Sequence, residues 1–303
     1  MASEWSYTYA VARIRVLETR LLSNNDVNTM AAQKSADAVL AAEERKTLQL
    51  RKELKIDPAA FELLSFPNLY HNLKTAIKEI CTSESNEEAF YPDEKYGRSE
   101  MLRILTEKDY KALPEHMRSA AATAMDVMLQ TRDGQKCDII VDRACLDAIE
   151  AAGKASPDKV IRDYAKSQVA VTNIKIAVRS AKTKKSLDFL HKALAPCASF
   201  DVRTLAQAAF QGVDALLDYL SSSGYAEAAE ALKKSPSAFE RWCDNRVIET
   251  IKPQKYEVCT VGPLVAYVLA RQNEIKTARI VITGKANGLS DEAIRERTRE
   301  MYV

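Results

Sequence analysis

The segment 262–303 constrains the fold more than any other part of the chain, because it carries the start and stop signals of two consecutive helices. Pro263 suits the first turn of a helix, where its missing N–H costs no hydrogen bond. Gly288 suits the left-handed residue that ends a helix, and Ser290 suits the N-cap of the next one. The segment therefore predicts a long helix over residues 263–286, a corner and a short second helix.

Apolar residues recur along the long helix at helical spacing, which predicts one buried face and one polar face. The apolar positions are Leu264, Val265, Val268, Leu269, Ile275, Ala278 and Ile282, and the polar positions between them are Arg271, Gln272, Lys276 and Arg279.

The whole chain favours helices. Its 303 residues include only 8 glycines and 9 prolines, and no convincing run of alternating β-branched residues occurs. An all-α fold is therefore expected. The least helical stretch is 82–97, which is acidic and predicts a long loop. The expected helices are 6–22, 34–55, 68–82, 114–131, 137–151, 157–182, 186–195, 202–221, 224–234, 237–251, 263–286 and 290–301.

A weak internal repeat with an offset of about one hundred residues runs through the chain. A repeat of this length is too long for a standard solenoid and fits three related helical domains, over 1–110, 111–198 and 199–303. A fainter N-terminal copy is expected over 12–26. The matched segments of the two clearer copies are 141–143 with 243–245, 174–177 with 275–278, and 184–190 with 288–294.

No motif of a catalytic, cofactor or metal site is present. The sequence has no phosphate-binding loop and no dinucleotide fingerprint, and no glutamate lies three residues before any histidine, as a metal-centred helical bundle would need. The six cysteines form no CxxC pair and predict reduced, mostly buried thiols. The histidines are His71, His116 and His191, and the cysteines are Cys81, Cys137, Cys145, Cys197, Cys243 and Cys259.

The overall charge does not favour nucleic-acid binding, because the formal net charge is only +2. Two local basic patches leave an alternative, which is a helical scaffold or regulatory protein with a basic nucleic-acid-binding surface. The patches are Lys182, Lys184 and Lys185, and Arg295, Arg297 and Arg299.

No signal peptide or membrane span is expected from the sequence. The first ten residues lack the apolar core of a secretory signal, and the longest apolar run, 261–270, is about half of a membrane span.

Residue pairs in the C-terminal segment, among them Ala266-Tyr267, Glu274-Ile275 and Gly288-Leu289, match one family. On these residues the chain resembles the C subunit of V-type and archaeal-type rotary ATPases, which is called the d subunit in the vacuolar enzyme. The resemblance covers essentially the full length and is strongest over 261–303. The chain departs from the family pattern at Gly262-Pro263, where Glu-Pro is frequent, and at Arg271-Gln272, where Lys-Glu is frequent. The matching pieces are Ala266-Tyr267, Glu274-Ile275, Ala278-Arg279, Gly284-Lys285, Gly288-Leu289 and Ile294-Arg295-Glu296-Arg297, together with the opening Tyr-x-x-Ala-x-Ala-Arg-Ile-Arg and Leu-Leu.

The resemblance implies three similar helical domains around a pseudo-threefold axis, forming a funnel or socket. It further implies a noncatalytic subunit that receives the central-stalk coiled coil and its small companion subunit, and that sits on the membrane rotor ring at the cytoplasmic face. No cofactor, nucleic acid or membrane span is expected. Basic positions expected near helix ends are the candidate partner contacts, although cations there also offset the helix dipole. These positions are Arg13, Arg179, Arg279 and Lys285.

Overall fold

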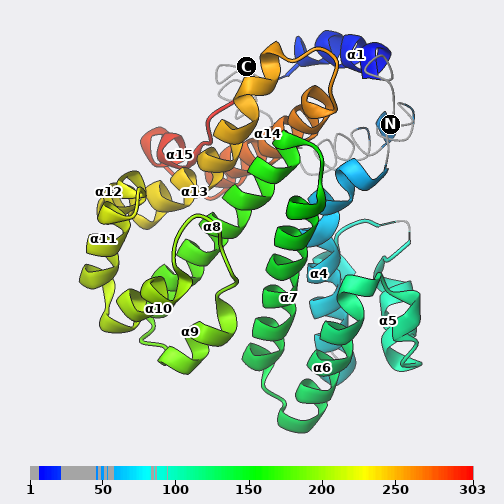
Figure 1. The fold of residues 1–303 in the computed structure, drawn as a ribbon, viewed down its shortest axis with the longest axis vertical. Helices are drawn as coiled ribbons and strands as arrows, with labels where there is room; N and C mark the ends of the chain where they lie inside the picture. The colour runs from blue at the N-terminus through cyan, green and yellow to red at the C-terminus, as the bar shows by residue number, and fades with distance from the viewer. Residues whose placement is uncertain are drawn as a thin grey trace. The chain divides into compact units, whose positions relative to one another are not determined.

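The computed structural model describes residues 7–21, 46, 49–50, 53, 58–82, 85, 87–93 and 95–302. Within these ranges the chain forms helices and connecting segments and contains no β-strand (Figure 1), which confirms the expected all-α class. Most of the expected helix over 34–55, and the corner that would follow the N-terminal copy of the repeat, lie outside the described residues.

Two compact units make up the chain. The first unit comprises the described residues of Met1–Ala60 together with Ser156–Val171 and Leu217–Val303. The second unit comprises Phe61–Ala155 and Thr172–Leu216. Both units combine segments that are far apart in the sequence. The division into three domains stays a prediction.

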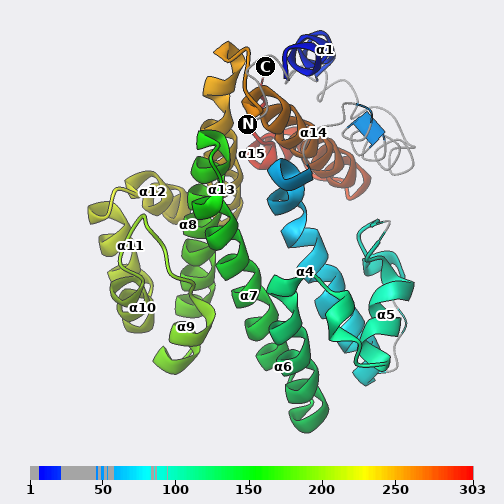
Figure 2. The same cartoon turned by 45° about the vertical axis from the view of Figure 1, so that its right-hand side comes forward.

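The second unit contains a helical hairpin of α6 and α7, which lie side by side in both views (Figures 1 and 2). Helix α9 packs against both α7 and α10. The elements that contribute to this unit are α4 (Pro58–Thr82), η2 (Glu87–Ala89), α5 (Arg98–Thr106), η3 (Tyr110–Ala112), α6 (Glu115–Thr131), α7 (Gly134–Ala155), the later part of α8 (Lys159–Lys182), α9 (Leu187–Ala193), α10 (Val202–Gln211) and the start of α11 (Val213–Ser222).

In the first unit α14 packs against α1, α13 and α15. The Arg15 side chain of α1 donates to the backbone carbonyls of Gln254, at 2.9 Å, and Glu257, at 2.6 Å, which ties α1 to the segment after α13. The unit holds α1 (Thr8–Glu18), the start of α8, most of α11, α12 (Ala226–Lys234), α13 (Pro236–Ile251), η4 (Lys252–Tyr256), α14 (Gly262–Ala286) and α15 (Asp291–Arg297).

Several expected helix boundaries are wrong. Helix α4 starts ten residues earlier than expected and continues through Pro67, because burial of Leu63, Phe66 and Leu69 outweighs the hydrogen bond that proline removes. The region 202–221 forms two helices, since Gly212 takes a left-handed φ of 127° between α10 and α11. Helix α5 is not among the expected helices, and the short α15 ends at Arg297 instead of near 301.

The first half of α14 is buried on every side. All residues of Gly262–Ala270 are buried, so the expected single apolar stripe is wrong there. A helix that is apolar all round is enclosed by its neighbours. In the second half Gln272, Lys276 and Arg279 are exposed, which agrees with a polar face, whereas Arg271 is partly covered.

The matched segments 184–190 and 288–294, which precede and begin α9 and α15, have the same backbone structure. Lys184 and Gly288 are left-handed, with φ of 50° and 69°. Ser186 and Ser290 then cap α9 and α15 through their hydroxyl oxygens, which accept from a backbone N–H three residues later at 3.2 Å. The predicted equivalence of 184–190 and 288–294 is therefore confirmed.

A buried asparagine in each of three long helices holds a later segment of the chain. Asn72 Nδ2 donates to Tyr91 O at 2.9 Å, and Tyr91 N donates back to Oδ1 at 2.8 Å. Asn173 forms the same pair of bonds with Ala195, at 2.8 Å and 3.0 Å. We call these contacts asparagine latches.

The third latch divides the two bonds between two helices. Asn273 Nδ2 donates to Glu300 O at 2.8 Å, and Glu300 N donates to Oδ1 of Asn245 on α13 at 2.9 Å. The three latching asparagines lie about one hundred residues apart, on α4, α8 and α14. Each of these three long helices thus carries an asparagine that binds a later segment of the chain, although the third latch needs a second asparagine.

Asn173→Leu removes both bonds to Ala195 while keeping the side chain similar in size. We expect a loss of about 2–4 kcal/mol in the free energy of unfolding, because the backbone N–H and C=O of Ala195 lose their partners. Urea unfolding measures the change, and Gln207→Leu on the exposed face of α10 is the control. Equal stability of the two variants would contradict a latch.

All six cysteines are free thiols, as expected, and four are buried. Burial raises the pKa of Cys137 to about 11 and that of Cys145 to about 12, which keeps both protonated at neutral pH.

In the native protein at pH 8 we expect a thiol reagent to modify Cys197 and Cys259, which are only half-buried, well before the other four cysteines. Mass spectrometry of the partly labelled protein locates the modified residues. Rapid labelling of Cys145 without unfolding would contradict the burial.

Candidate functional site

The four expected contact residues lie in different surroundings. Arg179 is exposed in the last turn of α8, and Lys285 is exposed in the last turn of α14, where it pairs with Asp291. Arg279 is exposed but lies in the body of α14, and Arg13 is not in the last turn of α1. The expectation of helix-end cations is therefore right for two of the four residues and wrong for Arg13 and Arg279.

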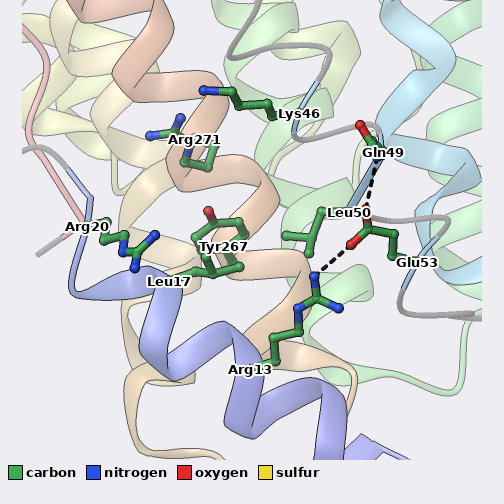
Figure 3. Close-up of a pocket in the computed structure, with 9 residues that line it drawn as sticks. All are labelled: Arg13, Leu17, Arg20, Lys46, Gln49, Leu50, Glu53, Tyr267 and Arg271. Carbon is green, nitrogen blue, oxygen red and sulfur yellow. Dashed lines mark hydrogen bonds and ion pairs between the residues drawn. The ribbon is translucent and has the colours of Figure 1, made fainter.

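Arg13 lines a pocket of the first unit, with a volume of about 370 Å³ (Figure 3). Four of the nine lining residues are cationic and one, Glu53, is acidic. Tyr267 of α14 lies centrally among the labelled side chains. Three parts of the chain line it: Arg13, Leu17 and Arg20 on α1; Lys46, Gln49, Leu50 and Glu53 between α1 and α4; and Tyr267 and Arg271 on α14.

Two ion pairs of different character flank this pocket. Arg13 contacts Glu53 at 2.6 Å, and both side chains are about two-fifths exposed. This pair raises the pKa of Arg13. Arg271 contacts Glu274 at 2.5 Å, and the Glu274 side chain is only 3% exposed. The Arg271 guanidinium thus stabilises a covered carboxylate as well as forming part of the pocket wall.

The second basic patch is not a uniform basic surface. Arg299 is buried, and its Nε donates to Asp244 at 2.7 Å. The same carboxylate accepts from Lys276 at 2.7 Å. Since Arg299 is engaged inside the first unit, the alternative of a nucleic-acid surface loses one of its six cations there. Lys182 and Lys184 remain exposed in the other patch.

Among the described residues, no group of three or more histidine, cysteine, aspartate or glutamate side chains is arranged to hold a metal ion. His71 and His116 serve contacts within the second unit: His71 bonds to Ala89 O, and His116 bonds to the Tyr70 hydroxyl, each at 2.9 Å. Within the described ranges, no helix combines the length and apolar character needed to cross a bilayer.

Comparison with known proteins gives the family. The model of the ATP synthase (C/AC39) subunit family matches residues 36–297. The chain belongs to this family. It is 21% identical to the C subunit of the V-type sodium ATPase of Enterococcus hirae, over 89% of this chain and 83% of the relative. It is 24% identical to the C subunit of the A-type ATP synthase of Methanocaldococcus jannaschii, over 95% of this chain and 85% of the relative.

A further relative, the C subunit of the A-type ATP synthase of Haloquadratum walsbyi, is 27% identical over 45% of this chain and 41% of its own length. The resemblance inferred from the sequence is therefore confirmed. The protein is a subunit of a V/A-type rotary ATPase, and the family is a non-catalytic accessory subunit of that enzyme. Because its family is non-catalytic, the chain is not itself an enzyme.

Several residues of the pocket could not be found from the sequence. The sequence around Arg20 and Lys46 does not indicate a pocket, because a single cation on an amphipathic helix is ordinary. Tyr267 and Arg271 belong to the strongest matching segment, but no local pattern shows that α1 packs beside them. The pocket is formed by tertiary packing between parts of the chain that are far apart in the sequence.

Arg271→Met leaves the nearly buried Glu274 without its guanidinium partner. We expect a loss of about 1.5–3 kcal/mol in the free energy of unfolding, because the covered Glu274 carboxylate loses a charge-assisted hydrogen bond from Arg271. Arg13→Met is the matched control, and we expect little change because its pair with Glu53 is exposed. Chemical denaturation compares the two variants, and equal losses would contradict the assigned difference in burial.

Proposed function

We propose that this chain couples the central stalk of a V/A-type rotary ATPase to the membrane rotor ring. In this role it is a socket of three similar helical domains that receives the stalk coiled coil and its small companion subunit. It sits at the cytoplasmic face of the membrane through the ring and transmits torque without catalysing a reaction. Membership in the ATP synthase (C/AC39) subunit family is the observation that carries the proposal.

The three asparagine latches support the proposal of three similar domains. They occur at a spacing of about one hundred residues, in α4, α8 and α14, and each holds a segment that follows its long helix. A coupling element must resist deformation, and close-packed helices with anchored return segments are stiff. The arrangement thus suits a part that moves as a rigid body under load.

The cations Arg13, Arg179, Arg279 and Lys285 are proposed contacts to acidic surfaces of the partners. Exposure of Arg179 and Arg279 supports their part in this proposal. Charged side chains at the rim of an interface chiefly set the association rate and its dependence on salt.

Co-expression with the central-stalk subunit of the same organism tests the proposed function. We expect a stoichiometric complex after affinity capture at moderate salt, and no ATP turnover by the isolated chain. Arg179→Glu and Arg279→Glu should slow association several-fold at low salt, because attraction at the rim becomes repulsion. Absence of a complex, with the chain folded and helical by circular dichroism, would contradict the socket, and ATP turnover by the pure chain would contradict a noncatalytic role.

A further inference from the structure

A groove with a volume of about 780 Å³ lies on the α6–α7 hairpin of the second unit. It is separate from the basic pocket of the first unit and contains none of the four expected contact residues. The polar part of its lining consists of His116, Ser119 and Thr123 on α6, Lys136, Arg143 and Asp147 on α7, and Lys192 on α9. Its apolar wall consists of Ala120, Val127, Ile139, Ile140, Ala144, Ala148 and Ala151.

Helix α7 is apolar on two sides. One side is buried in the second unit and includes Val141, Leu146 and Ile149. The other side, with Ile139 and Ile140 only half-buried, forms the groove. An extended apolar surface of this kind on a helix pair is typical of a protein-binding site.

The dimensions and side-chain sizes of the groove fit a helix. The lining positions on α7 run from Lys136 to Ala151, which corresponds to about 22 Å at 1.5 Å per residue. That length matches about four helical turns. The small side chains of Ala120, Ala144 and Ala148 allow a third helix to approach closely, because interaxial distance depends on the residues at the contact.

The charges at the edge favour an acidic occupant. Lys136, Arg143 and Lys192 are the cations of the lining, and Asp147 is its carboxylate. Arg143 is already engaged, since it donates to Asp147 at 3.0 Å and to Leu194 O at 2.5 Å. Burial lowers the pKa of His116, which disfavours its charged form.

Lys136 and Lys192 remain available to a partner. Lys136 lies 3.5 Å from Asp133, and Lys192 lies 2.7 Å from Asp188. The two lysine side chains are 59% and 66% exposed, and exposed pairs of this kind contribute little net free energy. Carboxylates of an incoming helix can therefore replace these partners at small cost.

We infer that the α6–α7 groove binds an amphipathic helix of another subunit, with an apolar stripe about four turns long and carboxylates along its flanks. Its aliphatic side chains fill the space above the alanines, and its carboxylates lie beside Lys136 and Lys192. This is helix-in-groove recognition. The inference rests on the proposed function in one respect: the helix belongs to another subunit of the rotary complex.

Site-specific cross-linking in the assembled complex tests the occupant. The photoreactive residue p-benzoylphenylalanine is placed at position 123 or 151, both exposed on the groove lining, and at position 129 as control. Leu129 is 46% exposed on α6 but does not line the groove. We expect positions 123 and 151 to cross-link to one acidic amphipathic helix of another subunit, and position 129 not to.

Other cross-linking results would overturn the inference. These are attachment to a second copy of this chain, attachment to another part of the same chain, attachment to a segment that is basic or not helical, or no attachment. A cross-link to an acidic helix of either the ring or the stalk would keep the groove, and co-expression with the stalk subunit tests the socket independently. The two experiments thus separate failure of the groove from failure of the socket.

Substitutions then test the charge and shape of the site, using the partner that the cross-link identifies. Ala151→Trp places a bulky ring at the exposed end of the groove, and Lys136→Glu with Lys192→Glu reverses its edge charge. We expect at least about tenfold weaker binding for each. The control for charge is Lys182→Glu with Lys184→Glu, which makes the same change in net charge elsewhere on exposed residues.

Circular dichroism and the melting temperature must match the wild type for every variant that enters the comparison. If Ala151→Trp fails to fold, the affinity of the Lys136→Glu/Lys192→Glu variant still tests whether the groove binds an acidic helix. Unchanged affinity of the lysine variant at low salt, or the same weakening in the control, would overturn the inferred acidic partner.

Discussion

A segment without regular secondary structure can be buried against a helix only where its backbone N–H and C=O groups find partners. In this protein the amide side chains of asparagine provide these partners. Asn173 uses both its donor and its acceptor on a single residue, Ala195, and is itself fully buried. Asn72 forms the same pair of bonds with Tyr91, and its Nδ2 also donates to Tyr96 O at 3.3 Å. The positions of the segments after the long helices depend on these bonds.

The third latch organises further contacts in the first unit. Because Glu300 is held by Asn273 and Asn245, the neighbouring Arg299 lies against Asp244 on α13. The chain end beyond it brings Met301 into an apolar cluster with Val281 and Ile294. Gly284 makes room for that packing, since a Cβ there would lie 2.8 Å from Ile294. The polar contacts of Glu300 and Arg299 therefore lie next in sequence to a residue, Met301, that packs against α15.

The parts of this fold that could be predicted from the sequence are those governed by neighbouring residues. Gly288 and Ser290 act through their own backbone and side chain, so the corner before α15 was predictable. The same holds for Ser186. In contrast, Pro67 lies inside α4 because of the residues that α4 buries, and no local signal reveals that balance.

The asparagine latches could not be predicted from the sequence for a related reason. Asn72, Asn173 and Asn273 are separated by 19 or more residues from the backbone groups that they bind. An asparagine within a helix is ordinarily a weak helix former and carries no hint of such a partner. The basic pocket could not be predicted from the sequence either, because its cations come from parts of the chain that meet only in the folded structure.

Helices α7 and α14 show why an apolar sequence pattern alone does not locate a binding surface. Both carry apolar residues on more than one side. In α14 the additional sides are covered within the first unit, as the burial of Gly262–Ala270 shows. In α7 the additional side consists mainly of alanines and two half-buried isoleucines, which line an open groove among the described residues. Burial in the folded chain, which the sequence pattern does not show, distinguishes the two helices, and the small side chains on the open face of α7 leave room for a further backbone.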